Sequence, residues 1–148
     1  MYKKNMMPFL LSLLFALSLP CHAENSQDFG EYVVHFNALN TTYLPPDATR
    51  EYGIKRSKNR GMVNITVLSK MLGTAGKPVQ ASITASAINL TGQKRDISLR
   101  EIHEGPAIYY IGDFPITNEE TLRFTVNVKP EGQKDTFEVN FKQQFFTE

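Results

Sequence analysis

The chain has 148 residues, of which 41% are hydrophobic and 21% are charged. These are the proportions and the length of one ordinary globular domain. The 16 basic and 15 acidic residues leave a formal net charge of +1, which gives no electrostatic reason to expect a nucleic-acid partner. The single cysteine excludes an internal disulfide framework and any zinc or iron–sulfur site built from several cysteines.

Residues 1–23 have the pattern of a cleaved signal peptide. Two lysines precede an apolar run from Met6 to Leu19, which is shorter than the roughly 20 apolar residues that a membrane span needs. Small residues at Cys21 and Ala23 match the usual cleavage pattern, so we expect the cut after Ala23 and export to the periplasm. A retained N-terminal anchor and a lipoprotein modified at Cys21 are the alternatives.

Cleavage at this point would leave residues 24–148 as a single domain. That part of the chain has a formal charge of −1 and contains no cysteine. It therefore cannot use a cysteine nucleophile, a thiolate metal ligand or a redox disulfide.

Alternation of hydrophobic and polar residues predicts strands along most of the mature chain. The inward face expected for 79–90 consists largely of alanine, which indicates a strand that lies close under a neighbouring sheet. Residues 24–28 are polar and are expected to be frayed. The predicted strands are 29–39, 62–70, 79–90, 96–103, 107–114, 122–129 and 137–146.

One short helix is expected after the first strand, from Pro46 to Tyr52. Proline suits a helix start because the first turn leaves N–H groups unpaired, and Asp47 in that turn complements the helix dipole. Gly53 suits the end of the helix as a left-handed cap. A basic connector, residues 56–60, follows.

About seven strands with turn signals every 8–15 residues predict an all-β fold. The class that we expect is an antiparallel immunoglobulin-like β-sandwich with one short helix. A small barrel is the alternative, because alternation alone does not separate the two architectures. An arrangement of alternating strands and helices is excluded, since only one short helix is available.

The mature chain carries no pattern typical of catalysis, and we expect neither an enzyme nor a cofactor. It has no Gly-x-Ser-x-Gly motif and no phosphate-binding loop. His35 and His103 are the candidate metal ligands, and Glu101 lies two residues before His103 on the same strand face. A small periplasmic metal-binding protein is therefore an alternative function, although solvated histidines are the simpler interpretation.

Several segments together resemble a small family of secreted bacterial proteins known only as a domain of unknown function. The resemblance extends over nearly the whole mature chain, and it implies a periplasmic all-β protein without assigning catalytic residues. The segments that carry it are 32–46 (YVVHFNALNTTYLPP), 52–54 (YGI), 56–58 (RSK), 61–65 (GMVNI) and 110–115 (YIGDFP).

A polar recognition surface is the functional site that the sequence favours. Hydrogen-bonding side chains on outward strand faces, beside a positively charged connector, suit the binding of a small polar group. Turn capping and a solvated connector would explain the same residues structurally. The candidate site residues are His35, Asn37, Asn40, Arg56, Ser57, Lys58 and Asn64.

We therefore expect a periplasmic, non-catalytic binding or accessory protein that recognises an envelope protein or a small ligand. Neither a nucleic-acid partner nor a membrane segment after signal cleavage is expected. A third possibility is a structural component that adds a strand to a partner's sheet. The aromatic terminal strand 137–146 is the segment that would be donated, although an ordinary last strand of the sandwich is the simpler interpretation.

Overall fold

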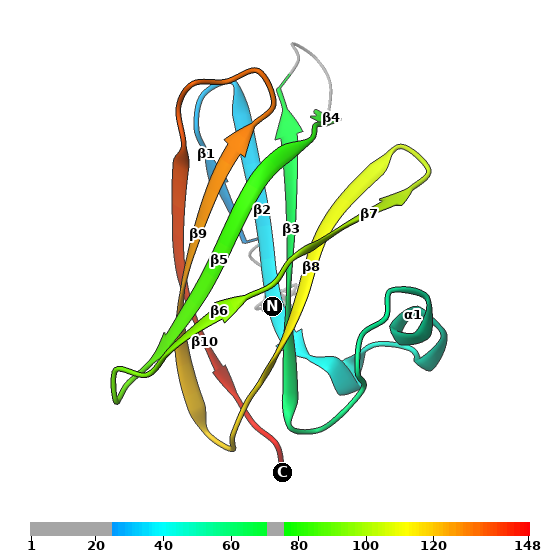
Figure 1. Ribbon diagram of the computed structural model, residues 1–148, viewed down its shortest axis with the longest axis vertical. Coiled ribbons are helices and arrows are strands. Elements are labelled where there is room, and N and C mark those ends of the chain that lie inside the picture. The colour runs from blue at the N-terminus through cyan, green and yellow to red at the C-terminus, as the bar shows by residue number, and fades with distance from the viewer. Residues whose placement is uncertain (1–24, 71–75) are drawn as a thin grey trace, which may run out of the picture.

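Two antiparallel sheets pack face to face in the computed structural model, which describes residues 25–70 and 76–148 (Figure 1). This confirms the predicted all-β sandwich and excludes the barrel. The predicted signal peptide lies outside the described residues.

Within the described part of the chain there are ten strands and one α-helix. The first sheet has the order β1–β2–β3–β8–β7, with β4 also beside β3, and the second has the order β10–β9–β5–β6. The strands of the first sheet are β1 (Ser26–Asp28), β2 (Tyr32–Asn40), β3 (Arg60–Ser69), β4 (Lys77–Pro78), β7 (Arg100–Glu104) and β8 (Ala107–Pro115). Those of the second sheet are β5 (Ala81–Asn89), β6 (Lys94–Ile97), β9 (Glu120–Pro130) and β10 (Phe137–Phe145).

The core lies between the sheets and consists of the side chains that the alternation predicts to point inward. Val63, Ile65 and Val67 of β3 are almost completely buried, as are the inward side chains of β9. Stacked rings join the sheets, with Phe141 lying 4.6 Å from Phe36 and 4.7 Å from Phe124 between ring centroids. Burial of this apolar surface is the main force that holds the sheets together.

Residues 96–103, predicted as one strand, belong to two strands in different sheets. Ile97 ends β6, which pairs with β5, whereas Arg100 begins β7, which pairs with β8. Ser98 and the residue after it carry the chain across the edge of the sandwich. The crossing runs so close to β8 that a Cβ atom on Gly112 would lie 2.5 Å from the carbonyl oxygen of Ser98.

The N-terminal segment is a strand rather than a frayed end, because β1 pairs with β2 from Ser26↔His35 to Asp28↔Val33. The predicted helix is confirmed as α1 (Pro46–Glu51), preceded by a 3₁₀ turn, η1 (Thr41–Tyr43). We call residues 41–59 the strap. Its Ile54 packs with Met62 and Ile111 in a second, smaller core on the outer face of the first sheet.

Candidate functional site at the parting of the two sheets

The first sheet divides where β3 changes partner. β8 pairs with β3 from Arg60↔Pro115 to Ile65↔Tyr110, and farther along β3 the partner is β4. The beginning of β8 continues with β7 as a hairpin, residues 100–109, which we call the β7–β8 arm and which leans away from β4 in Figure 1. A corner of the sandwich is thereby left open.

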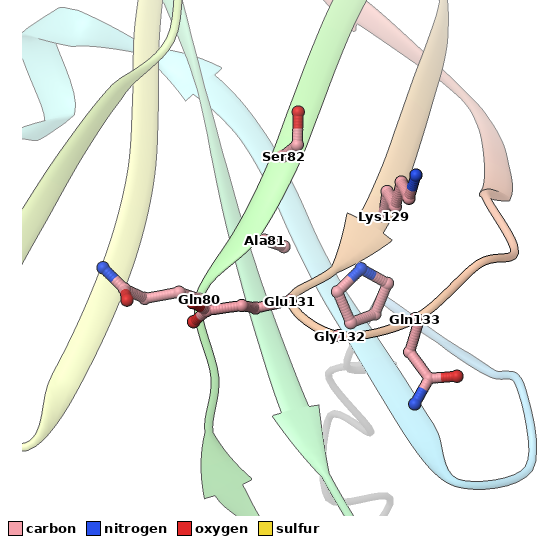
Figure 2. A pocket seen from close by; sticks show the side chains of 8 residues that line it. Gln80, Ala81, Ser82, Lys129, Glu131, Gly132 and Gln133 are labelled. Carbon is pink, nitrogen blue, oxygen red and sulfur yellow. The ribbon is translucent and has the colours of Figure 1, made fainter.

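Two adjoining hollows occupy this corner, and together we call them the corner pocket. The larger, of about 580 Å³, lies between β4 and the β7–β8 arm, and the smaller, of about 470 Å³, lies on the side of β9 (Figure 2). Both are lined by Gln80, Glu131 and Gly132. Lys77, Pro78, Val79, His103 and Ile108 complete the larger hollow, and Ala81, Ser82, Lys129, Pro130 and Gln133 complete the smaller one.

A polar bridge connects the two sheets beside the corner pocket. Gln80, just before β5, donates from Nε2 to Oε1 of Glu101 on β7 at 2.7 Å. Nε2 of His103 lies 2.6 Å from the same oxygen. The bonds from Gln80 and then His103 hold the pKa of Glu101 below its usual range. An ionised carboxylate only accepts, so the bond assigns the proton to Nε2 of His103 and leaves Nδ1 as an acceptor in the neutral ring.

Two further hydrogen bonds involve the backbone of the pocket. The N–H of Ala81 donates to the hydroxyl of Tyr110 at 2.8 Å, and burial raises the pKa of this tyrosine. The N–H of Glu131 donates to the carbonyl of Gln80 at 2.9 Å. These bonds hold residues 80 and 81 against Tyr110 of β8 and against the turn after β9, which favours a preformed site.

Three of the predicted site residues share the outer face of the first sheet, away from this pocket. Asn37 is paired with Asn64, and His35 lies two residues before Asn37 on the same face. Oδ1 of Asn64 is buried and has no hydrogen-bond partner. This juxtaposition agrees with the predicted faces.

The two histidines lie on opposite faces of the first sheet, so a single site cannot use both. On β2 the neighbours of His35, Val34 and Phe36, pack into the main core, so His35 points outward. His103 is paired with Ile108, which packs against that core. His103 therefore belongs to the inner face, at the open corner. Among the described residues, no group of three or more His, Cys, Asp or Glu side chains is arranged to hold a metal ion.

Arg56 and Ser57 of the basic connector fasten the strap. The guanidinium of Arg56 donates to the carbonyls of Thr42, at 3.0 Å, and Leu44, at 3.2 Å. The N–H of Ser57 donates to Oγ1 of Thr41 at 2.9 Å, and this hydroxyl donates back to the Ser57 carbonyl at 3.0 Å. These contacts satisfy backbone groups that would otherwise be unpaired in a folded loop.

Asn40 also has a structural partner. It points inward, it is 8% exposed, and its Nδ2 donates to the carbonyl of Phe146 at 2.6 Å. Lys58 is exposed on the strap.

The terminal strand is held within its own domain, because β10 pairs with β9 from Phe137↔Val128 to Phe145↔Glu120.

The residues of the corner pocket come mainly from parts of the chain that the sequence does not single out. Gln80, Glu131 and Lys77 are ordinary surface residues by type and lie up to 54 positions apart. Only the spacing of Glu101 and His103 offers a signal, and it cannot reveal that Gln80 lies opposite. Their proximity depends on the change of partner along β3.

A family model described as "Domain of unknown function (DUF4426)" matches residues 26–148. The chain belongs to this family. The DUF4426 protein is similar to a solved member, PA0388 of Pseudomonas aeruginosa PAO1, with 36% identity and a TM-score of 0.72. The match covers 82% of this chain and 93% of PA0388.

The fold is also similar to that of FetP from uropathogenic Escherichia coli strain F11. One FetP structure, of protein expressed in the periplasm, has 12% identity and a TM-score of 0.59, with 82% of this chain and 92% of that chain covered. A copper-bound FetP variant has 13% identity and a TM-score of 0.60, with coverages of 83% and 95%.

Among curated proteins, none matches the chain significantly. In the described ranges, no helix has the length and apolar character to cross a membrane.

Proposed function

We propose that this DUF4426 protein is an exported, non-catalytic binding protein of the cell envelope, and that the corner pocket is its recognition site. The observation that carries the proposal is the pair of adjoining hollows around Gln80 and Glu131. They lie at the corner of the sandwich where the partner of β3 changes from β8 to β4. The signal-peptide pattern of residues 1–23 supports export.

The chemistry of the pocket suits a ligand with several hydrogen-bonding groups. Gln80 and Gln133 supply amides, Glu131 a carboxylate, His103 an imidazole and Lys77 an ammonium. Lys77 and His103 lie on paired strands, and the N–H of Glu131 is bonded to the carbonyl of Gln80, so little ordering of the backbone would accompany binding. Sites that hold a few convergent polar groups on a rigid framework are typical of ligand recognition.

Site-specific photocrosslinking in intact cells of the native host tests this proposal. A photoreactive amino acid at Lys77 faces the larger hollow, and the matched control is the same amino acid at Leu90, which is exposed on the β5–β6 turn at the far end of β5. We expect one discrete adduct from position 77 and none from position 90. Equal adducts from both positions, or none from position 77, would contradict the proposal, as would substrate turnover abolished by changes in the pocket.

Metal binding through His103 is a second candidate function. Glu101 holds Nε2 of His103 at 2.6 Å, and histidines that bind a metal usually donate their other ring N–H to a carboxylate in this way. The copper-bound FetP variant shares the fold. Equilibrium dialysis against Cu²⁺ tests the idea. Stoichiometric uptake that is lost in His103→Ala and kept in His35→Ala supports it, and the absence of stoichiometric uptake refutes it.

A further inference from the structure

We infer that the corner pocket takes an extended peptide, which adds as a short strand to the edge of β8 at Ile108. This inference rests on the proposed function and names the class of partner for the same site. Strand addition to a sheet edge is an established mode of peptide recognition, in which backbone bonds give affinity and side-chain pockets give specificity.

The edge arises because β4 occupies the place on β3 that would otherwise pair with the beginning of β8. In the register of these two strands Ile65 pairs with Tyr110, so the residue opposite Ile108 would be Val67. The carbonyl of Val67 instead accepts the N–H of Val79 at 3.0 Å. Among the described residues, β8 therefore has β7 as its only strand partner at Ile108.

The backbone N–H and C=O groups of Ile108 point toward the pocket rather than toward β7. The β7–β8 turn is two residues long, with Glu104 paired to Ala107, and bonding directions alternate along an antiparallel strand. Tyr110 and Ile108 thus direct their N–H and C=O groups to the side of β3. Ile108 also lines the larger hollow.

The walls of the larger hollow suit the alternating side chains of a strand. Pro78, Val79 and Ile108 form an apolar part against which an aliphatic side chain would pack, while Lys77 and Glu131 provide charged groups of both signs. Successive side chains of a strand point to opposite faces. A peptide with aliphatic and polar residues in alternation therefore matches this surface better than a compact ion does.

Amide NMR spectroscopy of the ¹⁵N-labelled mature protein tests the inference with a defined probe. The probe is an acetylated and amidated peptide of alternating threonine and valine, and the control is the same peptide N-methylated at both valines. We expect the first peptide to slow hydrogen exchange of the Ile108 amide at least fivefold and to shift the signals of Val79 and His103. The outer edge of β10 is an internal control within the same molecule.

Equal effects of the two peptides, or changes confined to the β10 edge, would overturn the inference, as would no change at Ile108 at millimolar peptide. The proposed function has a separate readout. If the crosslink from position 77 forms but neither peptide affects Ile108, the pocket binds another kind of ligand and only the inference fails. If that crosslink is absent, the proposed function fails as well.

Discussion

Because Gly112 has no side chain, the chain can cross between the sheets close to β8. Replacing Gly112 with alanine tests this explanation. A Cβ atom at this position would lie 2.5 Å from the carbonyl oxygen of Ser98 and 2.7 Å from Cγ2 of Ile97. The nearer atom belongs to the backbone of the crossing segment, which β6 and β7 anchor on either side. The clash therefore cannot be relieved by rotating a side chain.

The expected cost follows from the extent of the overlap. Overpacking a well-packed site typically costs about 1–3 kcal/mol, and contact with backbone places Gly112→Ala at the upper end of this range. For a domain of this size, about 2–3 kcal/mol lowers Tm by roughly 8–12 °C. Gly61→Ala is a matched comparison, because the atoms nearest its Cβ belong to the rings of Phe114, at 2.8 Å, and Phe145, at 3.1 Å, and not to the backbone. We expect a smaller loss there.

Urea and thermal unfolding followed by circular dichroism would measure both variants against wild type, each as residues 24–148, the chain expected after signal cleavage. Gly132→Ala reports the cost of backbone strain alone, because Gly132 has a φ of 79° and nothing within 4 Å of its added Cβ. A change in the free energy of unfolding of less than about 0.5 kcal/mol for Gly112→Ala, the ordinary range for surface substitutions, would refute the close crossing.

Three further predictions follow from buried or bridging polar groups. Burial alone would raise the pKa of Glu120, but bonds from Arg95 and the backbone outweigh burial and lower the pKa. Ionised Glu120 therefore stabilises the fold above its unfolded pKa near 4.5. This contribution is lost as the pH falls through the lower pKa of the folded state. Urea titrations should show Glu120→Gln less stable than wild type by about 1–3 kcal/mol at pH 7, and this difference should shrink as the pH falls below 4.5. A difference that does not depend on pH would contradict this. Gln80→Ala should raise the pKa of Glu101 toward its ordinary value in a ¹³C NMR titration, and an unchanged pKa would show that the bridge does not form in solution. Asn40→Ala should lower the free energy of unfolding by about 1 kcal/mol and speed hydrogen exchange and carboxypeptidase trimming at the C-terminus. Unchanged trimming would show that the bond to the Phe146 carbonyl does not hold the C-terminus in place.

The faces of the long strands could be predicted from the sequence because period-two alternation is a local property. Val63, Ile65 and Val67 are buried as the pattern requires, and the helix from Pro46 follows its local start and end signals. The same pattern could not show that residues 96–103 divide between two sheets. Alternation continues through a crossing, and the close approach at Gly112 involves residues distant in the chain.

For the site residues proposed from the sequence, the face of the sheet could be predicted but the bonding partners could not. The outward positions of His35, Asn37 and Asn64 follow from strand parity, and the structure places them together. The partners of Asn40 and Arg56 do not follow, because the Phe146 carbonyl and the strap carbonyls are brought to them by folding. Residue type predicts a capacity for hydrogen bonding, whereas the identity of the partner depends on tertiary contacts.

The sequence by itself determined the class of the fold, the expected export and the family resemblance, since each depends on patterns within short stretches of chain. Only the tertiary structure decided where a pocket forms. Val67 bonds to Val79 rather than to Ile108, and this single exchange of strand partners opens the corner where Gln80 meets Glu101. Which distant segments pair depends on the packing of side chains across neighbouring strands, and the residues of one segment do not show who those neighbours are.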